Sequence, residues 1–223
     1  MDEEDQISFD LRTIRNIIIK QNSPDDNHSV VFEIFNRLNS GGINLKPQEI
    51  RTSLFHSKFY DMLYSINLYE NWRNLTPTTI PNINMRDIEI LLRGFAMLIN
   101  GEDYKPSMTR FLNMFSYRAK SFPDENINYL ENLFKKFIDS LPQHDQKFFH
   151  TKTGRFNISV SESIFLATCR EAFSNKNYEI HPISIEQLDQ LKNDEGFIEA
   201  TQSNTASAKN VQFRLNKAIK VIK

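Results

Sequence analysis

The chain has 223 residues, 39% of them hydrophobic, which is enough to bury the core of one large domain or two small ones. Its 27 basic residues nearly balance its 28 acidic ones, and the formal net charge of -1 excludes a global positive field that would gather nucleic acid or an anionic membrane. With Cys169 as its only cysteine, the chain has neither an intrachain disulfide nor a zinc site built from cysteines, which fits a reducing cytoplasm.

The composition also indicates the cellular setting and the fold class. No apolar run approaches the roughly 20 residues that cross a bilayer, and the acidic start MDEEDQ is unlike a signal peptide. We therefore expect a soluble, cytoplasmic protein with no membrane partner. The 18 Phe and only 6 Gly favour packed helices with large aromatic side chains over a β-sandwich. The predicted class is mainly α.

The first predicted element is one β-strand within residues 7–20, ISFDLRTIRNIIIK. The β-branched run from Ile17 to Ile19 has stiff side chains that favour an extended backbone. The segment QNSPDDN that follows contains the residue types that end elements and cap helices.

Two predicted helices then flank a pair of glycines. Apolar residues recur at three- and four-residue steps from Val30 to Leu38, which predicts an amphipathic helix that ends near residue 39. Gly41 and Gly42 suit a helix C-terminus, because glycine adopts the left-handed conformation at little steric cost. Pro47 suits the first turn of the second helix.

An irregular segment at residues 72–84, WRNLTPTTIPNIN, contains two prolines and predicts the boundary between an N-terminal region, 1–71, and a helical domain, 72–223. The last helix of that domain is predicted to begin at an N-cap, Thr205 or Ser207. Apolar periodicity and caps predict helices over residues 85–100, 107–120, 124–140, 159–174, 184–193 and 207–222.

Several kinds of catalytic site are absent from the sequence. The five histidines are scattered without the helical spacing of a metal pair, so no metal site is predicted. Cys169 lies in an apolar helix and is expected to be a small core residue rather than a nucleophile. The glycine pair lacks the Gly-Lys-Ser/Thr of a phosphate loop and the preceding strand of a dinucleotide-binding fold.

Two segments combine basic residues with other features. In RFLNMFSYRAKSF, residues 110–122, aromatic and basic residues alternate; at helical spacing such aromatics are more often core than platforms for nucleic-acid bases, and both interpretations stay open. The last helix is expected to present a solvated basic face, because lysines near a helix C-terminus favour its dipole. The residues of that face are Lys209, Arg214, Lys217, Lys220 and Lys223.

The stretch VFEIFNRLNSGGINLKPQEIR, residues 31–51, resembles the F-x-R-L-N-x-G-G-x-x-L-x-x-Q-E-x-R signature of domain-of-unknown-function family 262. That family forms the N-terminal domain of GmrSD-type modification-dependent restriction enzymes and has a ParB/sulfiredoxin-like fold. Similar family segments match MRDIEILLRGFAML, FLNMF and GRFNISVSESIF, so the resemblance extends over residues 11–222.

The resemblance implies a candidate nucleotide- or phosphate-binding site at the corner between the two helices. The arginines would contact phosphate in a bidentate manner; alternatively, the same polar network only makes the corner rigid. The matching positions are Arg37, Asn39, Gly41, Gly42, Gln48, Glu49 and Arg51.

The family's catalytic D-G-Q-Q-R motif has no counterpart in this chain. We therefore expect no catalytic residue, no metal and no cofactor within it; a nucleoside triphosphate would belong to a complete family member. The expected fold is a helical bundle preceded by a small α/β remnant, one strand plus helix, of a ParB-like domain. The strand, with Ile14, Ile17 and Ile19, would present an open sheet edge.

The resemblance implies the C-terminal part of a GmrSD-like, DNA-targeting defence protein. Expected partners are DNA, and an upstream catalytic chain or a second copy of this chain that pairs with the open edge. The alternative is a protein-interaction or regulatory module that pairs with a separate catalytic chain, and an inactive remnant is a third possibility.

Overall fold

The structure, a computed structural model, describes residues 2–13, 18, 29–38, 45–142 and 147–222. These residues are mainly α-helical and contain no β-strand; one isolated antiparallel bridge joins His150 and Phe156. None of the helices in these ranges is long and apolar enough to cross a membrane. The helices are α1 Glu3–Asp10, α2 Ser29–Leu38, α3 Pro47–Phe55, α4 Lys58–Asn67, α5 Glu70–Arg73, α6 Arg86–Asn100, the 3₁₀ helix η2 Gly101–Asp103, α7 Met108–Ala119, α8 Asp124–Ser140, α9 Ile158–Asn175, α10 Ile185–Asn193, α11 Glu195–Gln202 and α12 Ala208–Val221.

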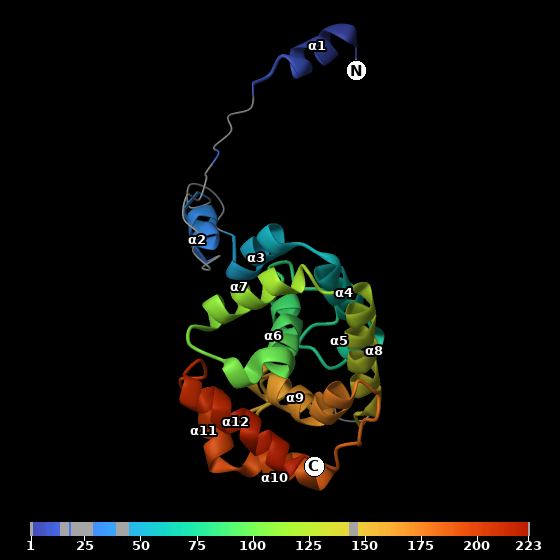
Figure 1. The fold of residues 1–223 in the computed structure, drawn as a ribbon, viewed down its shortest axis with the longest axis vertical. Coiled ribbons are helices and arrows are strands. Elements are labelled where there is room, and N and C mark those ends of the chain that lie inside the picture. The colour runs from blue at the N-terminus through green and yellow to red at the C-terminus, as the bar shows by residue number, and fades with distance from the viewer. Residues whose placement is uncertain (1, 14–17, 19–28, 39–44, 143–146, 223) are drawn as a thin grey trace.

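Helices α6 and α9 are packed against each other at the centre of the helical body (Figure 1). On one side α4 packs on α6 and α8, and at the lower end in Figure 1 α12 packs on both α9 and α11. Helix α2 contacts α3 and α7. One hydrophobic core therefore connects elements from α3 to the end of α12.

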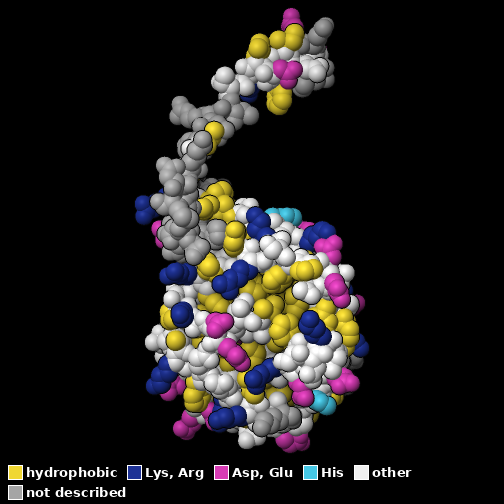
Figure 2. All heavy atoms as spheres, viewed as in Figure 1, with side chains coloured by type: hydrophobic (Ala, Val, Ile, Leu, Met, Phe, Trp, Pro, Cys, Tyr) yellow, Lys and Arg dark blue, Asp and Glu magenta, His cyan; other side chains and the backbone are white. Residues whose placement is uncertain are grey.

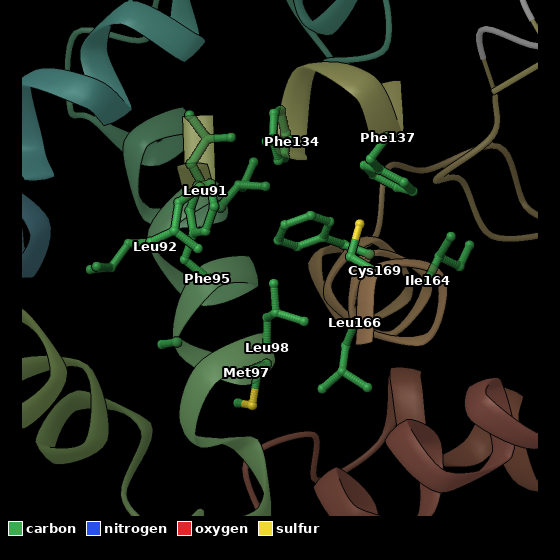
Figure 3. Packing of buried hydrophobic residues seen from close by; sticks show 14 of the residues in the cluster. Leu91, Leu92, Phe95, Met97, Leu98, Phe134, Phe137, Ile164, Leu166 and Cys169 are labelled. Carbon is green, nitrogen blue, oxygen red and sulfur yellow. The ribbon is translucent and has the colours of Figure 1, made fainter. Parts of the chain in front are cut away.

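Aromatic rings fill the centre of that core. Figure 3 shows Phe95 of α6, Phe134 and Phe137 of α8 and Cys169 of α9 in the same part of the interior. The ring of Phe165 lies 5.4 Å from that of Phe95 and 5.1 Å from that of Phe137, between ring centroids. Edge-to-face and tilted contacts of this kind add to the burial of apolar area. The core thus explains the high phenylalanine content.

The helices predicted beyond the irregular segment are confirmed as α6, α7, α8, α9, α10 and α12. Ser207 is the N-cap of α12, and its hydroxyl accepts a hydrogen bond from the Asn210 N–H at 3.2 Å. Cys169 is fully buried, as expected, and burial raises its thiol pKa well above the ordinary value. Helix α11 was not predicted; Asp194 caps it by accepting a hydrogen bond from the Phe197 N–H at 2.8 Å.

The prediction of a strand over residues 7–20 is wrong at its start. Residues 7–10 belong to α1, whose N-cap Asp2 accepts a hydrogen bond from the Asp5 N–H at 2.9 Å. A capped helix satisfies these backbone groups locally, whereas a strand there would need a neighbouring strand. Of the isoleucines assigned to the strand, Ile14, Ile17 and Ile19 lie outside the described residues.

The irregular segment predicted over residues 72–84 is confirmed as non-helical after Arg73, whereas its first two residues, Trp72 and Arg73, belong to α5. Arg73 holds the non-helical part in place. Arg73 donates from Nη1 to Asp87 Oδ2 at 3.0 Å, and from its other nitrogens to the carbonyl groups of Thr78, Thr79 and Ile80. Asp87 also accepts a hydrogen bond from the Asn82 N–H at 2.9 Å. The domain boundary at residues 71 and 72 remains a prediction.

Candidate functional site

The residues predicted for the phosphate site differ in their surroundings. Arg37 is in the last turn of α2 and exposed, whereas Gln48 and Arg51 of α3 are buried. Glu49 is half-buried. The other predicted site residues, Asn39, Gly41 and Gly42, lie outside the described residues.

The N-terminus of α3 fixes the orientation of these side chains. Pro47 occupies the first turn, and the Glu49 carboxylate accepts a hydrogen bond from the Lys46 N–H at 2.6 Å. A carboxylate at this place also interacts favourably with the helix dipole. With the helix start fixed, Gln48 and Arg51 lie one turn apart and both point into the body.

Arg51 is bound by protein groups on several sides. Its Nε donates to Asn113 Oδ1 of α7 at 3.0 Å, and its Nη1 donates to Gln48 Oε1. The Glu89 carboxylate of α6 lies 3.9 Å away, and the Phe32 ring of α2 lies 5.9 Å from the guanidinium carbon. Burial lowers the pKa of Arg51, although nearby Tyr60 and Glu89 oppose this. Arg51 therefore joins four helices.

Gln48 extends this network to α4. It donates from Nε2 to Thr52 Oγ1 at 3.2 Å, and it also interacts with the hydroxyl of Tyr60. The Tyr60 and Ser116 hydroxyl oxygens are 2.9 Å apart. Burial raises the pKa of Tyr60, so its hydroxyl stays neutral and available as a donor. We call Gln48, Arg51, Tyr60, Asn113 and Ser116 the corner network.

A second polar group continues from the corner network into the body. Glu89 and Arg93 lie one turn apart on α6, and Arg93 Nε donates to Glu162 Oε2 of α9 at 2.9 Å. The other oxygen of Glu162 accepts from Arg214 Nε of α12 at 3.1 Å. Glu162 and Arg214 are fully buried. We call Glu162, Arg93 and Arg214 the buried charge triad.

Within the triad, the two arginines compensate the buried negative charge of Glu162. Burial alone would raise the pKa of Glu162, but the charges and hydrogen bonds of Arg93 and Arg214 outweigh burial and hold that pKa below its ordinary value. Arg214 also donates to the carbonyl oxygen of Thr205 at 2.6 Å. The expectation that Arg214 belongs to a solvated basic face is therefore wrong, because its charge is used to join α12 to α9.

Other potentially reactive groups do not converge. Within the described residues, no group of three or more His, Cys, Asp or Glu side chains is arranged to hold a metal ion. His56 Nε2 lies 3.2 Å from Asp61 Oδ1, and both side chains are exposed. The residues that do converge, at the corner network and at the triad, make contacts that position helices.

Comparison with family models, with curated proteins and with solved structures finds no match to this chain. The resemblance to family 262 therefore stays a prediction from the motifs in the sequence. The sequence pointed to Gln48 and Arg51 but missed their partners Asn113 and Tyr60. Glu162 was also missed; a single carboxylate within the otherwise uncharged stretch SVSESIFLA was the available indication of a buried ion pair.

Proposed function

We propose that this chain is a noncatalytic helical module of a GmrSD-like, DNA-targeting defence protein, and that it docks onto a ParB-like α/β unit that carries the catalytic residues. Two lines of support exist: the motif resemblance, and the distribution of apolar side chains over the first helices. A nucleoside triphosphate, where the reaction uses one, would bind to the α/β unit.

The observation that carries the proposal is the two-sided character of α2. On one side, buried Phe32 lies against the guanidinium group of Arg51, and α2 packs on α3 and α7. On the other side, Val31 is 41% exposed and Leu38 is 53% exposed. An anchored helix that presents apolar side chains to solvent is typical of a surface that binds another protein.

Helix α1 presents a second set of exposed apolar side chains. Ile7, Phe9 and Leu11 are each more than half exposed, and Figure 2 shows hydrophobic side chains on this helix at the upper end of the molecule. Burying such side chains against a partner would contribute about 1.5–3 kcal/mol each. An apolar partner surface is therefore part of the proposal.

The corner network supports a positioning role. Because Arg51 donates to Asn113 and Gln48, its charge holds α2, α3 and α7 together beneath the exposed side chains. In this arrangement Arg37 is the arginine of the signature that is open to solvent. On the proposal, Arg51 keeps the docking surface rigid and Arg37 is available to a partner or to a phosphate.

Activity assays test the proposal. The purified chain is expected to show neither nucleoside triphosphate hydrolysis nor DNA nicking, and activity should require a separate ParB-like α/β protein that carries the D-G-Q-Q-R motif. Activity of the chain alone that is abolished by Glu49→Gln would contradict the proposal, because Glu49 serves here as a backbone cap.

The exposed apolar residues also favour a second candidate, a regulatory module that pairs with a separate catalytic chain without contacting DNA. The two candidates differ in one measurement. The defence module is expected to increase DNA binding by the catalytic chain, whereas a regulatory module is expected to leave it unchanged or lower it.

A further inference from the structure

A hollow of about 480 Å³ lies between α7 and the segment that leads into it from α6. In Figure 1 this segment curves outward at the left edge of the body before α7 begins. We call it the α7 hollow; its volume is within the range of small-ligand sites. Its lining residues are Asn100, Asp103, Lys105, Pro106, Arg110, Phe111, Met114, Phe115 and Arg118.

The charge of the α7 hollow differs from that of the whole chain. Lys105, Arg110 and Arg118 line it against one acidic residue, Asp103, although the formal net charge of the chain is -1. All three cations are exposed, and among the described residues no ion pair or side-chain hydrogen bond engages them. The lining of the hollow therefore has a local excess of positive charge.

The spacing of the cations indicates an extended anion. Arg110, Met114 and Arg118 follow one another every four residues, so they lie on one face of α7. Eight residues of helix separate the two arginines by about 12 Å. Phosphates spaced along a strand can contact both.

The remaining lining is apolar and partly aromatic. Phe111 and Met114 are half-buried, and the Phe111 ring is held edge-on against Tyr104 with 5.0 Å between ring centroids. A ring held in a hollow that is also lined by cations suits a flat base, since bases stack on aromatic side chains whatever the sequence. The hollow thus offers cations for the phosphates of a nucleic-acid strand and an aromatic ring for its bases.

We propose that the α7 hollow binds a single strand of nucleic acid, with Arg110 and Arg118 contacting phosphates of the strand and Phe111 contacting a base. Strand binding at the α7 hollow adds a DNA contact to the proposed function, and the choice of DNA over RNA rests on that function. It also assigns the DNA contact to residues of α7 outside the corner network, in which Arg51 is already used by protein groups.

The test is fluorescence anisotropy of the full chain with a short labelled oligothymidine at several salt concentrations. The double variant Arg110→Gln/Arg118→Gln is expected to bind about tenfold or more weakly, because each charged contact is lost. The slope of log affinity against log salt should decrease in magnitude by about 1.4, for two phosphate contacts. Phe111→Leu keeps an apolar lining and should weaken binding about fivefold or more.

The matched control is Lys152→Gln/Arg155→Gln, which removes the same charge from exposed residues that do not line the hollow. It should bind like the wild type. Equal affinity of the Arg110/Arg118 double variant and the wild type would overturn the proposal. So would full displacement of the strand by equimolar AMP, which would identify a free nucleotide as the ligand.

The two proposals fail in different ways. Strand binding that ignores Arg110 and Arg118 would remove the α7 hollow as the site but leave a DNA-targeting module intact. Strand binding through the hollow, together with full catalytic activity of the chain alone, would overturn the noncatalytic role and keep the site.

Discussion

At the scale of single residues, buried charges hold the helices of this protein in register. Glu162 receives hydrogen bonds from Arg93 and Arg214, which come from two other helices. Ion pairs buried in this way are costly to desolvate, and removing one partner leaves the other charge without compensation. The triad therefore specifies how α6, α9 and α12 meet.

Changing Glu162→Gln tests the triad. The variant should lose about 3 kcal/mol of unfolding free energy at neutral pH, because two guanidinium groups then face a neutral amide. The folded pKa of Glu162 is below the ordinary 4.5, so its contribution is complete above that pH and is lost as the pH falls through the folded value. Urea denaturation as a function of pH measures both effects, and the variant should show a shallower acid loss.

The control for this prediction is Glu171→Gln on the same helix, at an exposed position. It should change the unfolding free energy by no more than about 0.5 kcal/mol. If Glu162→Gln behaved like Glu171→Gln, the triad would not stabilise the fold.

The two arginines of the signature, Arg37 and Arg51, are expected to differ in their contribution to the unfolding free energy. Arg51→Ala is expected to lower the unfolding free energy by about 2 kcal/mol, because Asn113 and Gln48 lose a buried charged donor. Arg37→Ala, at an exposed position, should change it by no more than about 0.5 kcal/mol. Thermal or urea unfolding of the two variants distinguishes a positioning residue from a surface one, and equal effects would contradict the assignment.

At the scale of elements, apolar periodicity predicts long helices well because each must bury one stripe. Helix α8 runs from Asp124 to Ser140, the same residues that its pattern indicates. The start of a short helix depends on a single capping residue instead: Asp2 is the N-cap of α1 and Asp194 is the N-cap of α11. Neither cap stands out in the sequence, and the isoleucine run after α1 favoured the strand interpretation.

The site was predictable only in part, for a related reason. A local motif identifies Gln48 and Arg51, but their surroundings depend on residues far away in sequence, and Asn113 is 62 positions from Arg51. For the basic and aromatic segment at residues 110–122, the local sequence likewise does not reveal which distant residues lie beside it. Its periodicity places Leu112 and Phe115 in the core. Only the fold brings Arg110, Arg118 and Lys105 around one hollow.

At the scale of the whole molecule, the helical body is joined by one core and by polar contacts between distant elements. Apolar side chains are exposed at several places, including Leu68, Ile83 and Ile185, and those of α2 lie on a helix that packs against Arg51 of the corner network. Rigidity beneath an exposed apolar face lowers the ordering cost of binding. A rigid helical body with exposed apolar side chains favours a module that binds a partner through a preorganised surface.

On the proposed function α2 docks an α/β catalytic unit, and the most direct test is the mass and affinity of the complex with a ParB-like α/β protein that carries the D-G-Q-Q-R motif, by light scattering and titration. We predict a one-to-one complex that Leu38→Ser weakens by about tenfold or more. Ile185→Ser, a matched change at another exposed residue, should leave the affinity unchanged. Equal affinities for the wild type and Leu38→Ser, or no complex at all, would contradict the account.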